Sequence, residues 1–302
     1  MHSIEYMKRK TKSSDRMIFL TISYTFVAIT AFLCLMPFIL VISGSFSSQD
    51  AILKHGYSLI PEEFTLGAYK MAFMKPEDLF RAYGVTMMAT VLGTVIALFI
   101  TAMTGFVLTR KSFSWRNKFA FFFYFTTLFN GGIVPWYILC IRYLKLSDNF
   151  MALVIPFMLN VFYILVMKSF MSTIPDAISE SAKIDGANDF VIFIKLILPL
   201  SKPALATIGL FIALGYWNDW FTSFMFIQDT KLFSLQFYLY KIVTGAQALL
   251  RLASVVGIDR AKVPTEALKL AMTVITTGPI ILLYPFVQRY FITGLTIGAV
   301  KG

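Results

Sequence analysis

Six long apolar runs, separated by shorter polar segments, constrain this chain more than any other feature. The first covers about residues 17–44, which exceeds the roughly 20 helical residues needed to cross a hydrocarbon core about 30 Å thick. Five more follow, at about 82–108, 119–141, 150–171, 203–227 and 267–291. Because backbone polar groups inside a bilayer must be satisfied within the segment, each run is predicted to be helical. The predicted fold class is an all-α membrane protein with six transmembrane helices.

The composition supports this class. Hydrophobic residues make up 58% of the chain and charged residues only 14%, whereas a soluble domain is about 45–50% apolar and about 25% charged. The 31 phenylalanines among 302 residues are too many for one soluble core of this size. An ordinary soluble domain is therefore excluded.

The distribution of positive charge predicts the orientation. Lys and Arg cluster in the tail at 1–16 and between the second and third runs, which the positive-inside rule places in the cytoplasm. Six spans then leave both termini and the segment near 174–200 inside, with loops at about 45–81 and 229–265 outside. A net charge of +11 can also indicate nucleic acid, but here the cations flank apolar runs, so no nucleic-acid partner is predicted.

The sequence offers little for catalysis. His2 lies in the basic terminus and His55 in an outer loop, and no G-x(4)-G-K-[ST] phosphate-binding run occurs. Cys34 and Cys140 lie in separate apolar runs and are interpreted as small hydrophobic residues. We therefore predict that the chain is not an enzyme, and that it has no catalytic residue, metal site or bound cofactor.

The polar interruption before the fifth run is predicted to form a helix, a turn and a second helix outside the bilayer. Pro175 suits a first helical turn, since its fixed φ is pre-organised there. Asp185 and Gly186 supply the break, because glycine accepts a positive φ, and the Asp185 carboxylate is expected to cap the following helix. Pro199 and Pro203 then mark the start of the next span.

This interruption also carries a motif, formed by Glu180-Ser181-Ala182, Asp185-Gly186-Ala187, Phe193, Leu196, Leu198-Pro199 and Pro203. It resembles the coupling loop of ABC-importer permeases, written E-A-A-x-x-D-G-A-x(5)-F-x-x-I-x-L-P-x(3)-P. The sequence departs from that motif at Ser181 (for Ala) and Leu196 (for Ile), both mild changes. The resemblance implies that Glu180, Ser181, Ala182, Asp185, Gly186 and Ala187 couple the chain to an ATPase.

The resemblance extends along nearly the whole chain to the carbohydrate-uptake branch, through Ser58–Pro61, Phe129–Pro135, Gly215–Trp220, Gly294–Thr296 and Gly298–Gly302. It implies the type I ABC-importer permease fold in a bacterial cytoplasmic membrane, with residues 17–302 forming one transmembrane domain. It also implies a second permease subunit, an ATPase homodimer that binds ATP and Mg²⁺, and an extracytoplasmic sugar-binding protein. In maltose-type relatives the tail corresponding to Val300, Lys301 and Gly302, within the cytoplasmic segment 293–302, reaches into the ATPase interface.

The segment Trp217-Asn218-Asp219-Trp220 places an amide and a carboxylate between two tryptophans, inside an otherwise apolar run. A carboxylate near the bilayer centre costs about 2.5–3.5 kcal/mol, so it is expected to face a cavity or a partner. Tryptophan faces could then stack on sugar rings while the amide and carboxylate bind hydroxyl groups. The alternative places Asp219 near the outer end of the span, with Trp217 and Trp220 in an interfacial belt.

Two weaker path candidates lie in the third run. Tyr137 is an aromatic residue of the type that lines sugar sites. Asn130, followed by two glycines, suits an unwound stretch that lines the path, although glycine packing between helices explains the same pattern.

The predicted function is that of a membrane-spanning subunit of an ATP-driven, binding-protein-dependent importer of sugars, with oligosaccharides favoured. The alternative is an ion-coupled secondary transporter that uses Asp219 and would not need the coupling motif. Within the outer loop 229–265, residues Ala246 to Val255 are predicted to form a short amphipathic helix on the side where relatives dock the binding protein.

Overall fold

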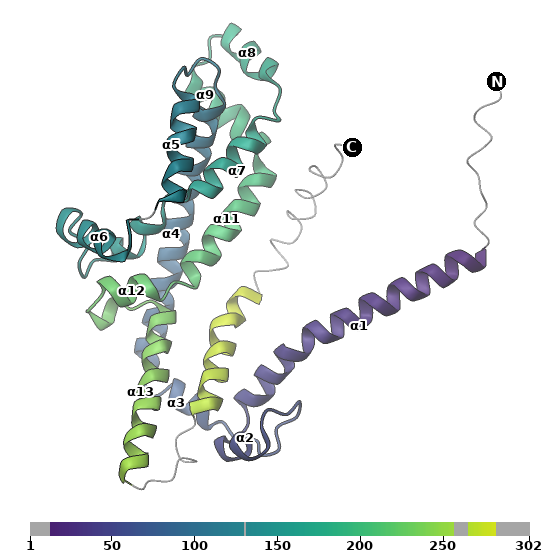
Figure 1. Ribbon diagram of the computed structural model, residues 1–302, viewed down its shortest axis with the longest axis vertical. Helices are drawn as coiled ribbons and strands as arrows, with labels where there is room; N and C mark the ends of the chain where they lie inside the picture. The colour runs from purple at the N-terminus through teal and green to yellow at the C-terminus, as the bar shows by residue number, and fades with distance from the viewer. Residues whose placement is uncertain (1–12, 130, 257–264, 282–302) are drawn as a thin grey trace. The chain divides into compact units, whose positions relative to one another are not determined.

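The computed structural model describes residues 13–129, 131–256 and 265–281, and every regular element in these residues is a helix (Figure 1). The chain divides into two compact units, residues 1–72 with 246–275 and residues 73–245 with 276–302. The two units are described separately below.

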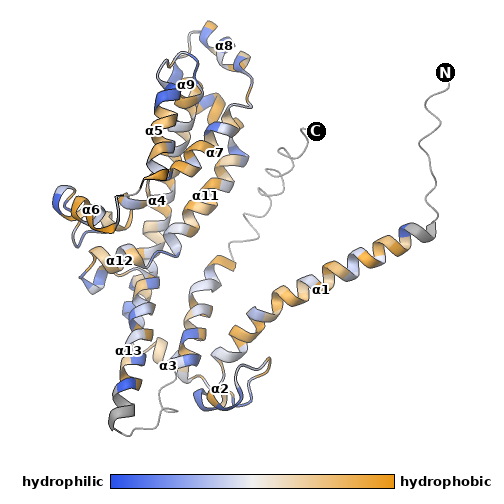
Figure 2. Ribbon diagram, viewed as in Figure 1, coloured by the Kyte–Doolittle hydropathy of each residue, from blue (hydrophilic) through white to orange (hydrophobic). Residues whose placement is uncertain are grey.

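The first unit begins with α1 (Ser13–Ser45), a single 33-residue helix that contains Pro37. Figure 2 shows hydrophobic residues along most of its length, and its large apolar side chains are exposed in the isolated chain. A soluble helix would bury one apolar face, whereas a helix that is apolar all round suits lipid or a membrane partner. The first predicted span is thus confirmed as one long apolar helix.

The rest of the first unit is organised around Gln49. This residue opens α2 (Gln49–His55), and α3 (Gly67–Ala72) follows. The Gln49 Oε1 atom accepts hydrogen bonds from the backbone N–H of Glu266, at 2.9 Å, and of Ala267 at the start of helix 265–281. Since the first N–H groups of a helix have no partner within it, Gln49 supplies the cap. Ile52 and Ala68 pack against Ala267 and Ala271 to form a small core.

The second unit is built on α4 (Pro76–Thr109), against which α7 (Val161–Met171) and α11 (Lys202–Trp217) pack. Their core includes Phe106, Met167, Phe193, Ile208 and Tyr216. A Cβ atom at Gly105 would lie only 3.1 Å from the Lys168 backbone nitrogen, so this glycine lets α4 and α7 approach closely. The helix α4 starts at Pro76 instead of residue 82, because Pro76, Glu77 and Asp78 form a favourable first turn.

The predicted third and fourth spans are both broken. The helix α5 (Arg116–Leu128) and the stretch Ile133–Tyr143, which comprises α6 (Ile133–Ile138) and the π-helical turn η2 (Leu139–Tyr143), meet at 115°. The expected break at the two glycines is confirmed by Gly132, whose φ is +88°. The fourth run starts as the short 3₁₀ turns η3 (Phe150–Leu153) and η4 (Ile155–Phe157), bent by 51° from α7.

The predicted fifth span and outer loop also differ from the structure. The helix α11 ends at Trp217, and a separate short helix, α12 (Phe221–Phe226), follows the break. The 3₁₀ turn η6 (Thr230–Leu232) leads into α13 (Leu235–Val256), a helix of 22 residues. The expected amphipathic helix over 246–255 is therefore only the second part of a longer helix. We expected Leu235–Tyr240 to belong to a polar loop, whereas the structure makes this stretch the first turns of the helix.

Two described helices, α1 (from Arg16) and α4, are each long and apolar enough to cross a membrane. Three bent helix pairs are also long and apolar enough if each pair counts as one span. They are the broken third and fourth runs and the pair Asp189–Leu200 with Lys202–Trp217, which meet at 83°. The described residues thus hold up to five spans. The last predicted run is helical over 267–281 and continues outside the described residues.

Candidate functional site

The segment with the resemblance motif forms α8 (Asp176–Ile184), closed by a hydrogen-bonded turn. Pro175 immediately precedes the helix, with ψ of 132°, and is not part of its first turn as expected. At the other end, Gly186 N–H donates to Lys183 O at 3.0 Å and Ala187 N–H donates to Ala182 O at 2.9 Å. This pair is the Schellman helix ending, which needs a left-handed residue. Gly186 supplies it with φ of +82°, as predicted.

The expected capping role of Asp185 is wrong. Asp185 is the C-terminal cap residue of α8, and the next helix, α9 (Asp189–Ile192), is capped by Asn188, whose Oδ1 accepts from Val191 N–H at 2.9 Å. Asn188 stands three residues before Val191, which is the spacing that a side-chain cap requires. Asp185 lies too early in the chain, at the end of α8. The helix α9 continues through a π-helical turn, η5 (Phe193–Ile197), and α10 (Leu198–Leu200) into α11. Pro199 and Pro203 stand in the first turns of α10 and α11, as the boundary prediction required.

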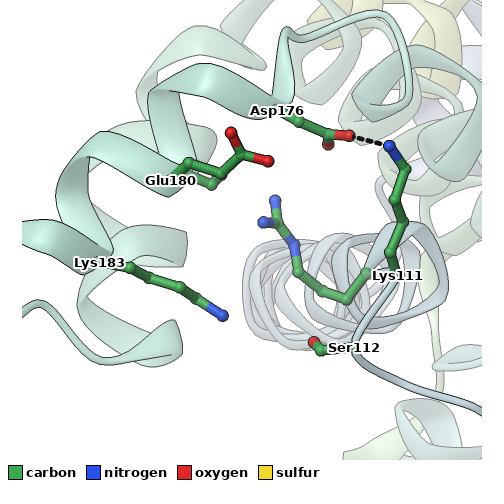
Figure 3. A pocket seen from close by; sticks show the side chains of 7 residues that line it. Lys111, Ser112, Asp176, Glu180 and Lys183 are labelled. Carbon is green, nitrogen blue, oxygen red and sulfur yellow. Dashed lines mark ion pairs between the residues drawn. The ribbon is translucent and has the colours of Figure 1, made fainter.

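One face of α8 borders a pocket of about 160 Å³ (Figure 3). Asp176, Ser179, Glu180 and Lys183 recur at helical spacing on that face, and the segment just after α4 supplies Arg110, Lys111 and Ser112. In Figure 3 the Glu180 carboxylate points into the pocket, between Asp176 and Lys183. The pocket thus joins an exposed, mixed-charge helix face to the segment that follows α4.

Ion pairs hold this arrangement. Lys111 Nζ lies 2.6 Å from Asp176 Oδ2, and Lys183 Nζ lies 3.1 Å from Asp189 Oδ1. Through its hydrogen bond and charge, Asp176 raises the pKa of Lys111, and Lys111 in turn lowers the pKa of Asp176. The Arg110 guanidinium lies over the Phe106 ring at 4.3 Å. Because all these groups except Phe106 are hydrophilic and exposed or half-buried, the contact orients α8 more than it stabilises the fold.

The six motif residues divide between two roles. Glu180, Ser181, Asp185 and Gly186 are exposed, and nothing lies within 4 Å of a Cβ atom placed on Gly186. By contrast, Ala182 and Ala187 are half-buried and pack against the core of the second unit. The motif therefore fixes a short helix to the core on one side and leaves its other side open.

The segment Trp217–Trp220, at the end of α11, also has two residues bonded within the fold and two that are exposed. Trp217 is buried, and its Nε1–H donates to Thr276 O at 3.2 Å. The Asp219 Oδ1 atom accepts from Thr222 N–H at 3.1 Å, within the first turn of α12, and its backbone carbonyl accepts from Ser234 Oγ. Trp217 and Asp219 thus hold the chain where it turns from α11 into α12.

The neighbouring Asn218 and Trp220 are exposed instead. Gln236 Nε2 donates to Asn218 Oδ1 at 3.3 Å, and the Trp220 ring stacks on Tyr240 with centroids 4.9 Å apart. Sequence reasoning missed both partners on α13, and also missed Lys111. The four-residue spacing of Gln236 and Tyr240, one helical turn, was the available signal, but it is visible only once α13 is known to begin at Leu235.

The remaining candidates are less informative. Tyr137 is exposed at its edge and lies nearly parallel to Phe226, with ring centroids 5.7 Å apart. Asn130 and the tail Val300, Lys301 and Gly302 lie outside the described residues. Among the residues that are described, no three His, Cys, Asp or Glu side chains come together as metal ligands.

Comparison with known proteins connects these features to one family. Residues 102–297 match the family model described as binding-protein-dependent transport system inner membrane component. That range contains α8, its capping turn and the Trp217–Trp220 segment.

Two relatives come from Bacillus subtilis (strain 168). The polygalacturonan/rhamnogalacturonan transport system permease protein YtcP is 36% identical, over 92% of this chain and 96% of the relative. Protein LplC is 37% identical, over 89% of this chain and 90% of the relative.

A solved structure is similar along most of the fold. It is a crystal structure of a bacterial ABC transporter involved in the import of the acidic polysaccharide alginate. One of its chains matches with a TM-score of 0.74 and 31% identity, covering 92% of this chain and 98% of that one. The protein described here is therefore a transport subunit and not an enzyme, and it belongs to the family of binding-protein-dependent transport system inner membrane components.

Proposed function

We propose that this chain is one of two membrane-spanning subunits of an ATP-driven importer that carries oligosaccharides across the cytoplasmic membrane. The observation that carries the proposal is α8 with its capping turn: Ala182 and Ala187 pack on the core while Glu180, Ser181 and Gly186 stay exposed. A short helix fixed on one side and open on the other suits docking to a second protein. Family membership makes a separate ATPase the expected partner.

In this proposal α8 works as a rigid lever. Closure of the ATPase dimer around ATP moves α8, and the core contacts of Ala182, Ala187 and the following η5 pass that movement to α4, α7 and α11. The spans then open outward and receive a sugar from the extracytoplasmic binding protein. Hydrolysis restores the inward-facing state, and the sugar shifts the populations only through its different affinity for the two states.

The sugar class rests on the relatives. The printed names refer to polygalacturonan and rhamnogalacturonan for YtcP and to alginate for the solved structure. A further relative, AraQ of Halalkalibacterium halodurans, is named for arabinooligosaccharides and is 28% identical over 98% of this chain and 100% of the relative. These substrates are polymers or oligomers, and two of the three names refer to uronic-acid polysaccharides. We infer an oligosaccharide substrate for this chain, with acidic sugars as the first to test.

The proposed assembly contains this chain, a related second permease, an ATPase homodimer and a solute-binding protein. ATP and Mg²⁺ belong to the ATPase, so this chain binds no cofactor of its own. Six spans place both termini in the cytoplasm, where Val300, Lys301 and Gly302 would meet the ATPase. The loops around 45–81 and 229–265, helical parts included, then lie on the extracytoplasmic side, where the binding protein docks.

The ion-coupled alternative finds less support. It requires the Asp219 carboxylate to bind a proton or cation, but one oxygen already accepts from Thr222 N–H in the first turn of α12. Family membership also favours ATP-driven import.

The test is co-purification of the chain with its partner permease and ATPase, followed by binding-protein-stimulated ATP hydrolysis. The variants are Glu180→Ala and Gly186→Asp. The matched control is Arg142→Ala, an exposed charged residue in η2, which belongs neither to α8 nor to the two loops at 45–81 and 229–265.

Loss of ATPase from the purified complex, or of stimulated hydrolysis, in both α8 variants but not in the control supports the proposal. Normal assembly and normal stimulated turnover in both α8 variants would remove α8 from the coupling role. Uptake by the chain without any ATPase would favour the ion-coupled alternative.

A further inference from the structure

Four exposed or half-buried residues form one face where α12 meets the start of α13. Trp220 and Tyr240 contribute aromatic rings, and Asn218 and Gln236 contribute amides; we call them the aromatic–amide face. They come from two segments, the turn before α12 and the first turns of α13.

The geometry of this face is specific. The Trp220 and Tyr240 rings stack with centroids 4.9 Å apart and an interplanar angle of 27°. Gln236 Nε2 donates to Asn218 Oδ1 at 3.3 Å. Because Gln236 and Tyr240 are four residues apart on α13, they lie on the same side of that helix, one turn apart. The stacked ring pair and the hydrogen-bonded amide pair thus lie next to each other, one helical turn apart.

The residues that precede and separate them in the chain show that this exposure is selective. Tyr216 is buried and donates its hydroxyl to Val154 O at 2.8 Å, and Trp217 is buried and bonded to Thr276 O. The Asp219 carboxylate accepts from Thr222. Those three residues are held by hydrogen bonds within the fold. Trp220 also contacts the Phe221 and Phe224 rings and Tyr240 contacts Phe237, yet Trp220 stays 40% exposed and Tyr240 44% exposed.

The chemistry of the face matches a sugar. A pyranose ring presents an apolar face of C–H groups and a rim of hydroxyls, so it packs on aromatic rings and exchanges hydrogen bonds with side-chain amides. Each amide offers two donor hydrogens and an acceptor. Asn218 Nδ2 donates to Leu214 O at 2.9 Å and Asn218 Oδ1 accepts from Gln236, which leaves one N–H on Asn218 and the acceptor oxygen and one N–H on Gln236 for a ligand.

We infer that the aromatic–amide face is a subsite for one sugar ring of the transported oligosaccharide. The inference rests on the proposed function, which supplies the sugar, and it assigns Gln236 and Tyr240, on α13, to the substrate path together with Asn218 and Trp220. Trp217 and Asp219 are positioning residues that hold the turn from which Asn218 and Trp220 project.

A lipid-facing aromatic belt is the competing explanation for the two rings. Such a belt needs rings near the headgroups but gains nothing from two paired amides beside them, since amides removed from water without full hydrogen bonding cost free energy. The amide pair therefore favours a polar ligand over lipid.

The test measures uptake and ATP hydrolysis together in proteoliposomes that contain the whole complex and its binding protein. The sugar probes are trisaccharides of galacturonan and of alginate, with maltotriose as the neutral comparison. The variants are Trp220→Ala, Tyr240→Ala and Gln236→Ala, with Trp220→Phe as the conservative replacement. The matched control is Tyr143→Ala, an exposed tyrosine on η2, outside the face.

Loss of a ring that contacts the sugar should lower the amount of sugar carried per ATP about two- to tenfold. Stimulated hydrolysis should stay near the wild-type rate, because α8 and its contacts to the core are unchanged. Trp220→Phe should keep most of the wild-type amount of sugar carried per ATP, and Tyr143→Ala should leave that amount unchanged.

Unchanged ratios in all three alanine variants, or an equal fall of uptake and hydrolysis, would overturn the subsite and favour a lipid or packing role. Loss of assembly in all three variants would assign the face to subunit packing and also overturn the subsite. If the wild-type complex shows no stimulated uptake of any probe, the proposed function itself fails, a result distinct from a failure of the subsite.

Discussion

Lys111 Nζ lies 2.6 Å from Asp176 Oδ2, which ties the segment after α4 to the first turn of α8. The two residues are 65 positions apart, and both are exposed or half-buried, so the pair contributes little to folding. Its consequence is geometric. It helps to fix the direction of a short helix in which Ser179 is buried and Ala182, together with Ala187 of the following turn, packs on the core.

Reversing one charge of this pair should impair coupling. In Lys111→Glu the new carboxylate repels Asp176, so α8 loses its fixed direction, and sugar transported per ATP should fall while assembly persists. The exchange variant Lys111→Glu with Asp176→Lys should recover much of the ratio because it restores the attraction. Lys118→Glu, an exposed lysine in the first turn of α5, is the control. A ratio in Lys111→Glu equal to that of wild type would show that the pair does not direct α8.

The same pair predicts a flat pH response near neutrality. Asp176 has a lowered pKa, so its contribution is present above the ordinary value of 3.8 and is lost as the pH falls through the folded-state value. Lys111 has a raised pKa, so its contribution is present below 10.5 and is lost as the pH rises through its own folded-state value. The sugar transported per ATP by wild type, divided by that of Lys111→Ala, should therefore stay constant from about pH 6 to about pH 9. A ratio that varies strongly within this range would contradict the assignment.

Replacements of Gly186 can separate backbone strain from contact with a partner. A side chain there meets nothing within 4 Å in the isolated chain, yet φ is +82°. Gly186→Ala should thus destabilise the turn by about 1–2 kcal/mol. Gly186→Asn should cost less, because asparagine tolerates the left-handed region. If a partner backbone approaches this glycine, Asn should lower stimulated hydrolysis at least as much as Ala, despite its smaller effect on thermal unfolding. Activity that follows stability in the two variants would show that only the turn matters.

The sequence predicted the apolar helices and two of the breaks because those features are local. Composition within about 20 residues determines whether a segment can cross a bilayer, and Gly132 and Gly186 have the backbone freedom that their positive φ values require. The same reasoning placed the turn between α8 and α9. It named Asp185 as the cap and did not consider Asn188, although both residue types cap well and only the end of the turn decides which one stands at the cap position.

The features that the sequence missed depend on distant pairing. Nothing local to Lys111 indicates Asp176, and nothing local to Trp220 indicates Tyr240, since each pair forms only when separate helices pack. The start of α13 was missed for a related reason: Gln236 and Tyr240 find their partners, Asn218 and Trp220, only when this helix packs beside the turn before α12. The sequence therefore identified Trp217 to Trp220 as a group, but it could not sort the buried members from the exposed ones.

Two glycines on α4 should respond oppositely to alanine. At Gly105 a Cβ atom would lie 3.0 Å from Met167 Cγ and 3.1 Å from the Lys168 backbone nitrogen, so the α4–α7 contact must open. Gly105→Ala should lower the free energy of unfolding by about 1–3 kcal/mol. At Gly84 nothing lies within 4 Å, so Gly84→Ala should be neutral or stabilising by up to about 1 kcal/mol through helix propensity. Thermal unfolding of the purified chain in detergent measures both, and equal effects would contradict the close approach.

Asp148 should prove to be a clasp between two segments about 80 residues apart. Its Oδ1 accepts from the N–H groups of Gln228, at 3.0 Å, and Asp229, at 2.8 Å, and its own N–H donates to Phe226 O at 2.8 Å. Its φ is +51°, a conformation that Asp and Asn tolerate better than Ala.

Three replacements distinguish these contributions. Asp148→Asn keeps an acceptor oxygen and tolerates the backbone, so it should stay within about 0.5 kcal/mol of wild type. Asp148→Gly keeps the backbone freedom but loses the acceptor, and Asp148→Ala loses both, so unfolding should become easier in the order Asn, Gly, Ala, with Ala costing about 1–3 kcal/mol. Because the clasp holds the end of α12, Asp148→Ala should also weaken sugar transport per ATP, through displacement of the turn that carries Trp220. Equal unfolding midpoints for Asn and Ala would show that the carboxylate contacts do not hold the two segments together.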